Sequence, residues 1–191
     1  MQPRILYFSI LSFLLLALSC REGSDIECYH GTPSAILSSK NPSVLKHEFI
    51  LDSTTMEAGL GISSVERAYI SDTIGYKIPM TLEIQQQGCD DIFQLYNFIY
   101  KVDFGDGNVS KVDYSWWLER AATEFFKLSK LQPSLSMYNQ WGQVILEAKD
   151  KNLLRLGEQL EVEESTYIKV NRIVSDQGAI ITVEISQIDE E

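Results

Sequence analysis

Apolar and polar residues alternate along the chain between residues 74 and 85. The apolar residues at every second position are Ile74, Tyr76, Ile78, Met80, Leu82 and Ile84. This period of two predicts a β-strand that buries one of its faces. Pro79 lies on the opposite face and has no N–H for a strand ladder, which predicts an edge strand or a bulge at that point.

Five other segments are rich in the β-branched and aromatic residues that are typical of strands: 45–52, 65–71, 92–104, 158–174 and 179–188. Gly88 and its neighbours provide turn chemistry, so 74–85 and 92–104 are expected to pair as an antiparallel hairpin. The last two segments are expected to pair as a closing hairpin across residues 175–178.

In the middle of the chain the hydrophobic period changes to that of a helix. From an N-cap at Asp113 or Ser115, apolar residues recur every three or four positions: Tyr114, Leu118, Ala121, Phe125 and Leu128. Pro133 ends this helix, and residues 134–149 are predicted as a second, weaker helix that contains Gly142. Strands on both sides of a helical pair predict an α+β fold, a mostly antiparallel sheet with an amphipathic helical pair packed on one face.

Residues 1–20 differ in character from the rest of the chain. Arg4 supplies a positive start, and the run Ile5–Leu18 is apolar except for Ser9 and Ser12. The run is shorter than the roughly 20 apolar residues that cross a bilayer, and its length and flanks are those of a secretory leader. We therefore expect residues 1–19 to be a signal peptide.

The leader ends in Leu16-Ala17-Leu18-Ser19-Cys20, which resembles the lipobox of bacterial lipoproteins. The resemblance implies that Cys20 becomes the lipidated N-terminus and that its acyl chains anchor the protein in a membrane. Arg21 follows Cys20 in place of an Asp, which implies delivery to the outer membrane of the cell envelope, on either its periplasmic or its surface side. The alternatives are an ordinary cysteine after signal cleavage and an uncleaved N-terminal anchor.

Composition divides the rest of the chain into a tether and a domain. Residues 20–43 are rich in Ser, Gly, Pro, Asn and Thr, which is typical of a lipidated tether. Residues 44–191 have the length and apolar content of a single globular domain. The net charge of −11 gives the protein a field that repels phosphate backbones, so we expect no nucleic-acid partner.

Cysteine and histidine limit the covalent and metal chemistry of the domain. Cys28 and Cys89 are an even pair in an extracytoplasmic protein, which favours a disulfide and leaves open two unpaired thiols. The only histidines are His30 and His47, and no two cysteines have ligand spacing. We therefore expect no metal site, and no motif calls for another cofactor.

The sequence favours binding over catalysis. It contains no nucleophile elbow, no zinc-protease motif and no phosphate-binding glycine loop. Exposed tryptophan and tyrosine are the usual anchors of a binding patch, so we expect a protein partner at a patch formed by Trp116, Trp117, Tyr96 and Tyr100. The alternative is an envelope hydrolase that uses paired carboxylates, for which the sequence offers Asp90, Asp91, Glu161, Glu163 and Glu164.

Overall fold

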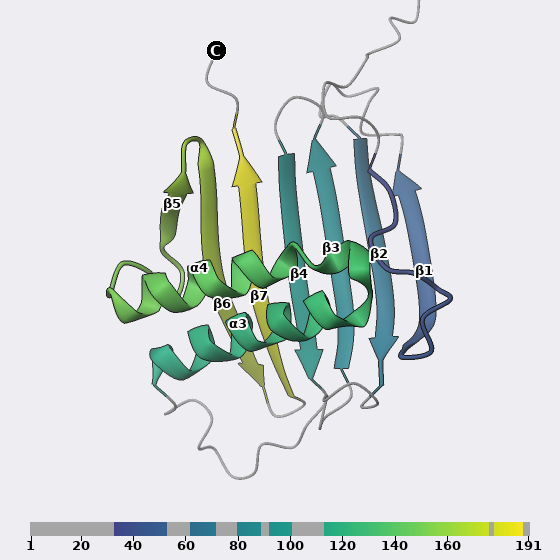
Figure 1. The fold of residues 1–191 in the computed structure, drawn as a ribbon, viewed down its shortest axis with the longest axis horizontal. Helices are drawn as coiled ribbons and strands as arrows, with labels where there is room; N and C mark the ends of the chain where they lie inside the picture. Colours follow the sequence, from purple (N-terminus) through teal and green to yellow (C-terminus); the bar gives the residue numbers. More distant parts are fainter. Residues whose placement is uncertain are drawn as a thin grey trace, which may run out of the picture.

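A seven-stranded antiparallel sheet carries the helical pair of the described chain on one of its faces (Figure 1). The computed structural model describes residues 33–52, 62–71, 80–88, 92–100, 113–175 and 178–188. Each pair of neighbouring strands in the sheet is antiparallel. The predicted α+β class, a mostly antiparallel sheet with two helices packed on one face, is confirmed.

The strands lie across the sheet in the order β1-β2-β3-β4-β7-β6-β5. Their bounds are β1 (Val44–Asp52), β2 (Ile62–Ile70), β3 (Met80–Gly88), β4 (Ile92–Tyr100), β5 (Gln159–Glu163), β6 (Thr166–Ser175) and β7 (Gly178–Gln187). The first four strands and the last three form two antiparallel runs, which meet where β4 pairs with β7, for example at Phe98 and Ile181. Both helices lie between these runs in the sequence.

The structure corrects two expectations about the strands, the edge position of one strand and the continuity of another. Residues 80–88 form strand β3 between β2 and β4, and therefore do not lie at an edge. Pro79 itself, where a bulge was the alternative, lies outside the described residues. The segment predicted as one strand over 158–174 is two strands, β5 and β6, because Ser165 turns the chain with a φ of 59°.

The two helices begin and end where their local chemistry requires. Helix α3 (Tyr114–Leu131) has Asp113 as its N-cap, and the Asp113 side chain accepts the N–H of Ser115. A short 3-10 turn, η3 (Pro133–Leu135), separates α3 from α4 (Tyr138–Asp150). A Cβ on Gly142 of α4 would lie 2.5 Å from the ring of Phe126 on α3. The glycine that weakens the second helix in the sequence therefore allows the two helices to approach closely.

The hydrophobic core lies between the helical pair and the sheet. Phe125 of α3 makes edge-to-face contacts with Tyr96 and Phe98 of β4, at centroid distances of 5.2 and 5.6 Å. The other large side chains that are fully buried are Trp117, Ile70, Met80, Leu82, Ile84, Leu118, Leu128 and Ile145. Alternate residues of the central strands point to the opposite face, where they are half-buried or exposed, as expected of a sheet covered on one side.

Residues 33–43, which we call the strap, lie against the first strands of the sheet on the side that carries the helices (Figure 1). The sequence assigns these residues to the tether, and the structure gives them a defined place. Leu37 belongs to the hydrophobic core with 4% exposure, and Ile36 packs against that core. Two adjacent aliphatic residues in an otherwise polar segment are the local reason for this docking.

Candidate functional site

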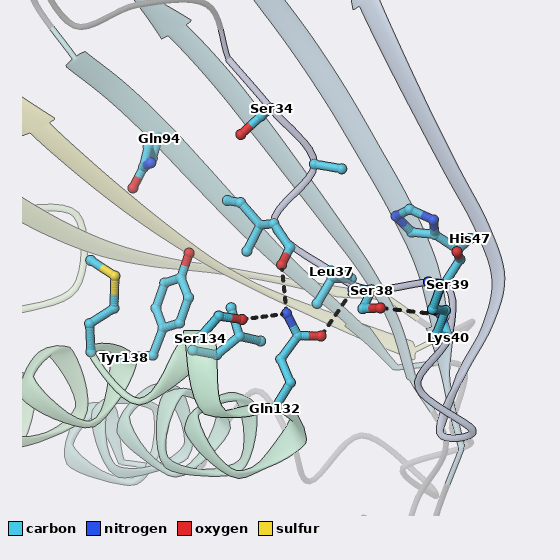
Figure 2. A pocket seen from close by; sticks show the side chains of 14 residues that line it. Ser34, Leu37, Ser38, Ser39, Lys40, His47, Gln94, Gln132, Ser134 and Tyr138 are labelled. Carbon is cyan, nitrogen blue, oxygen red and sulfur yellow. Dashed lines mark hydrogen bonds between the residues drawn. The ribbon is translucent and has the colours of Figure 1, made fainter.

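A pocket of about 620 Å³ lies where the strap, the turn between the helices and the sheet meet (Figure 2). Residues 34–40 of the strap line one side of it. The opposite side is lined by Gln132, Ser134, Leu135, Met137 and Tyr138. His47 of β1 and Gln94 of β4 are the lining residues that the sheet contributes. The volume lies within the range of small-molecule sites.

Glu66, on strand β2, holds the strap against the sheet. Its side chain is fully buried, and its carboxylate accepts the N–H groups of Ile36 and Leu37 at 2.7 and 2.9 Å. The same carboxylate lies 2.6 Å from Nε2 of His47. Burying a carboxylate is costly unless it is paired and hydrogen-bonded, and the strap supplies two of the three donors that Glu66 uses.

His47 reaches Glu66 because strand β1 is irregular. Between Leu45 and Glu48 the register shifts, and β1 has one more residue there than β2. Lys46, within this bulge, has a φ of 49°. Bulges redirect side chains to the other face of a strand, and here the His47 side chain lies beneath the strap with 13% exposure. The bulge therefore places a histidine at the edge of the pocket.

Gln132 holds the strap from the helical side. The residue is the C-cap of α3, and its Oε1 accepts the N–H of Ser38 at 3.0 Å. Its Nε2 donates to the carbonyl of Ile36 at 3.1 Å and to Oγ of Ser134 at 2.7 Å (Figure 2). On the sheet, Gln86 of β3 donates to the carbonyl of Ser34 at 3.0 Å. Side chains of three elements thus bind main-chain groups of the strap.

Two tyrosine hydroxyls and an amide form a polar group near the other end of the pocket. Oη of Tyr96 donates to Oε1 of Gln94 at 2.9 Å and lies 2.9 Å from Oη of Tyr138. Burial raises the pKa of Tyr138 to about 12 and the pKa of Tyr96 well above its ordinary value. Both phenols therefore stay protonated at physiological pH, and the lining Tyr138 offers a neutral hydroxyl.

The charges of the pocket differ from those of the chain as a whole. The chain has 27 acidic residues, yet none of the residues that line the pocket is acidic. Lys40 and His47 are the basic side chains of the lining, and the other polar lining groups are hydroxyls and amides. Such a lining favours a polar ligand that carries no positive charge.

The lining does not assemble a nucleophile. His47 uses Nε2 toward Glu66, and no hydroxyl of the described lining residues is hydrogen-bonded to its ring. An activated serine needs such a contact with its base.

The four aromatic residues predicted as a binding patch do not share a surface. Tyr96, Tyr100 and Trp117 are buried with at most 4% exposure, and Trp116 is 41% exposed. The two tryptophans are neighbours on α3, and adjacent helical positions point about 100° apart, so one faces the core and the other faces solvent. The patch of four is wrong, and Trp116 is the member that a partner could contact.

The remaining predicted residues lie elsewhere or outside the described residues. Glu161 and Glu163 are exposed on β5, an outer strand of the sheet, and Glu164 is exposed in the turn that follows. None of the three lines the pocket. The residues that fall outside the described part of the chain are Cys20, Cys28, Cys89, Asp90 and Asp91.

The described part of the chain offers neither a cluster of metal ligands nor a membrane-spanning helix. No group of three or more His, Cys, Asp or Glu side chains in it could hold a metal ion. No helix in the same part has the length and apolarity that a membrane crossing requires.

Sequence reasoning did not find the three residues whose side chains bind the main chain of the strap, Glu66, Gln132 and Gln86. Glu66 carries a signal in retrospect, because it is in phase with Ala68 and Ile70, which are buried on the same face of β2. A carboxylate on a buried face requires donors nearby. Gln132 precedes Pro133, and nothing in the local sequence indicates its long-range contacts.

Comparisons of the chain with protein-family models, with curated proteins and with solved structures find no match. The fold and the pocket therefore carry the functional argument.

Proposed function

We propose that this protein is a lipid-anchored binding protein of a bacterial envelope, and that its site is the pocket beside the strap. The ligand is a small polar molecule without positive charge. The observation that carries the proposal is a pocket whose polar lining groups are hydroxyls, amides and two basic side chains, with no carboxylate among them, in a chain of net charge −11. A cation would be drawn to the rest of this surface, whereas the pocket lacks the carboxylates that would hold it.

The anchor rests on the resemblance of residues 16–20 to a lipobox. Acyl chains on Cys20 would hold the protein through buried methylenes, at about 0.8 kcal/mol each. The strap is the last part of the predicted tether. In this arrangement the pocket lies close, along the chain, to the point where the protein leaves the membrane.

A binding experiment with probes of different charge tests the proposed ligand class. The soluble Cys20→Ala form is titrated separately with glucose, N-acetylglucosamine, acetate, inorganic phosphate and spermidine, and backbone amide shifts are followed by NMR. We expect at least one neutral or anionic probe to shift the amides of Gln94, Ser134 and Tyr138. The Gln94→Ala variant should weaken that response, and the exposed control Gln143→Ala on α4 should leave it unchanged.

The spermidine titration supplies the opposite outcome. If spermidine shifts the pocket amides and none of the neutral or anionic probes does, the proposed ligand class is wrong. If spermidine shifts only amides of acidic surfaces such as that of Glu161 and Glu163, the charge argument stands.

A further inference from the structure

The hydrogen bonds that join residues 34–38 of the strap to Glu66, Gln86 and Gln132 are all made to main-chain groups of the strap. Glu66 accepts two N–H groups, Gln132 accepts a third and donates to a carbonyl, and Gln86 donates to a second carbonyl. The strap side chain that enters the core is that of Leu37. The groove formed by Glu66, Gln86 and Gln132 therefore recognises main-chain groups of the strap and the aliphatic side chains of Ile36 and Leu37, and any copy of residues 34–38 would satisfy it equally.

The link between the strap and strand β1 is a local turn. The N–H of Asn41 donates to the carbonyl of Ser38 at 3.0 Å, and the N–H of Val44 donates to the carbonyl of Asn41 at 3.0 Å. Lys40 and Pro42 are exposed in this turn. Straightening it breaks these local bonds and the contact of the Asn41 amide with the carbonyl of Leu131, and it leaves the docking groups of residues 34–38 intact.

We infer that the strap can dock onto a second copy of this chain, so that two molecules exchange their straps. Each pocket is then lined by the sheet and helices of one copy and by residues 34–38 of the other. The exchange restores the five main-chain hydrogen bonds and the burial of Leu37 in the partner, and it costs the turn contacts. Exchange of an identical element is a low-cost route to a dimer.

Concentration decides between the closed and the exchanged forms. A short linker gives docking within one chain an effective concentration on the order of millimolar. Dilute protein is therefore mainly closed, and crowding of anchored copies on a membrane favours exchange. In this respect the inference rests on the proposed anchor, although the groove itself can be tested without lipid or ligand.

Two complementary variants of the full chain, each in the Cys20→Ala background, test the exchange. Glu66→Gln disables the groove and keeps the strap, and Leu37→Asp disables the strap and keeps the groove. The strap of the first variant can then dock only on the groove of the second. Within one chain, the docked strap is favoured roughly 100-fold over the undocked strap. Dividing the millimolar effective concentration by this factor gives a Kd on the order of 10 µM for docking between two chains. At ~100 µM of each variant, native mass spectrometry and analytical ultracentrifugation should find mostly heterodimer.

Matched controls separate exchange from nonspecific association. Leu51→Asp changes an exposed leucine on β1, and Glu163→Gln changes an exposed glutamate on β5. These two variants should stay monomeric when mixed, as should each test variant alone. The milder Leu37→Ala is mixed with Glu66→Gln in parallel, and both pairs are also refolded together, so that poor folding of one partner does not hide the result.

Heterodimers in the mixed or co-refolded test pairs, with none in the controls, support the exchange. If both test pairs remain monomeric, the strap docks only within its own chain and the inference is overturned. Because no lipid or probe ligand is present, this failure would leave the proposed anchor and ligand class untouched.

Discussion

The buried carboxylate of Glu66 gives a quantitative prediction for the strap. Its two bonds to main-chain N–H groups are charge-assisted and contribute about 1.5–3 kcal/mol each. The three bonds from Gln132 and Gln86 contribute about 0.5–1.5 kcal/mol each. Burial of Leu37 adds about 1.5–3 kcal/mol. These contributions together amount to about 10 kcal/mol at their midpoints.

Ordering residues 34–38 opposes these contributions. At 1–2 kcal/mol for each residue, the backbone entropy costs about 7.5 kcal/mol. The strap is therefore docked with a net free energy of roughly 2–3 kcal/mol. Removal of the Glu66 charge takes away more than this net amount, so Glu66→Gln releases the strap. Once the strap is released, its contacts no longer contribute to the stability of the remaining fold. The variant therefore loses at most roughly 2–3 kcal/mol of unfolding free energy, which is the net contribution of the docked strap.

This limit makes the mutations non-additive. Leu37→Ala should cost about 2–3 kcal/mol for the same reason, and the double variant should cost no more than either single variant. Urea unfolding at neutral pH measures the three values, and hydrogen exchange measures the amides of Ile36 and Leu37, which should lose protection in all three variants. Glu163→Gln, on an exposed outer strand, should change stability by less than about 0.5 kcal/mol. Additive losses in the double variant would refute the reasoning.

Three further predictions concern the helices and the tyrosine pair. Trp117→Ala should cost about 3–5 kcal/mol in urea unfolding because Trp117 is buried, whereas its exposed neighbour Trp116 should tolerate alanine within about 1 kcal/mol. Gly142→Ala should lower the melting temperature, because the clash with the ring of Phe126, at about 1–3 kcal/mol, outweighs the gain of about 1 kcal/mol in helix propensity; an unchanged or higher melting temperature would show that the ring moves aside. The raised pKa of Tyr138, about 12, favours the neutral phenol in the fold, so the unfolding free energy should fall as the pH rises from about 10 to about 12. Tyr138→Phe should make this fall shallower, and an unchanged slope would contradict the assignment.

The sequence predicts the architecture well because periodicity reports local geometry. The alternation around Met80 to Ile84 and the helical spacing of Leu118, Phe125 and Leu128 each require only neighbouring residues, and both elements are present in the structure. The position of β3 inside the sheet depends on which strands pair with it, which a local pattern does not contain. The edge position inferred from Pro79 was therefore wrong, and the bulge that was its alternative lies outside the described residues.

The pocket is harder to predict because its parts are far apart in the sequence. Gln132 is 94 residues from Ser38, and Glu66 is 29 residues from Leu37. Each looks like an ordinary polar residue in its own segment. The prediction of an aromatic binding patch was wrong for a related reason. Tyr96 and Trp117 are buried in the core, and composition alone does not separate a core aromatic residue from an exposed one.

Attachment to a membrane through Cys20 is the central claim of the proposed function, and cell fractionation tests it most directly. The full chain and its Cys20→Ala form are expressed with their own leader, and membrane and aqueous fractions are probed for each. We expect the full chain in the membrane fraction, with a mass increase on its mature N-terminal peptide that corresponds to acyl chains, and the variant in the aqueous fraction. If Cys20→Ala remains with the membranes, or if the N-terminal peptide carries no lipid, the claim of a lipid anchor at Cys20 is contradicted.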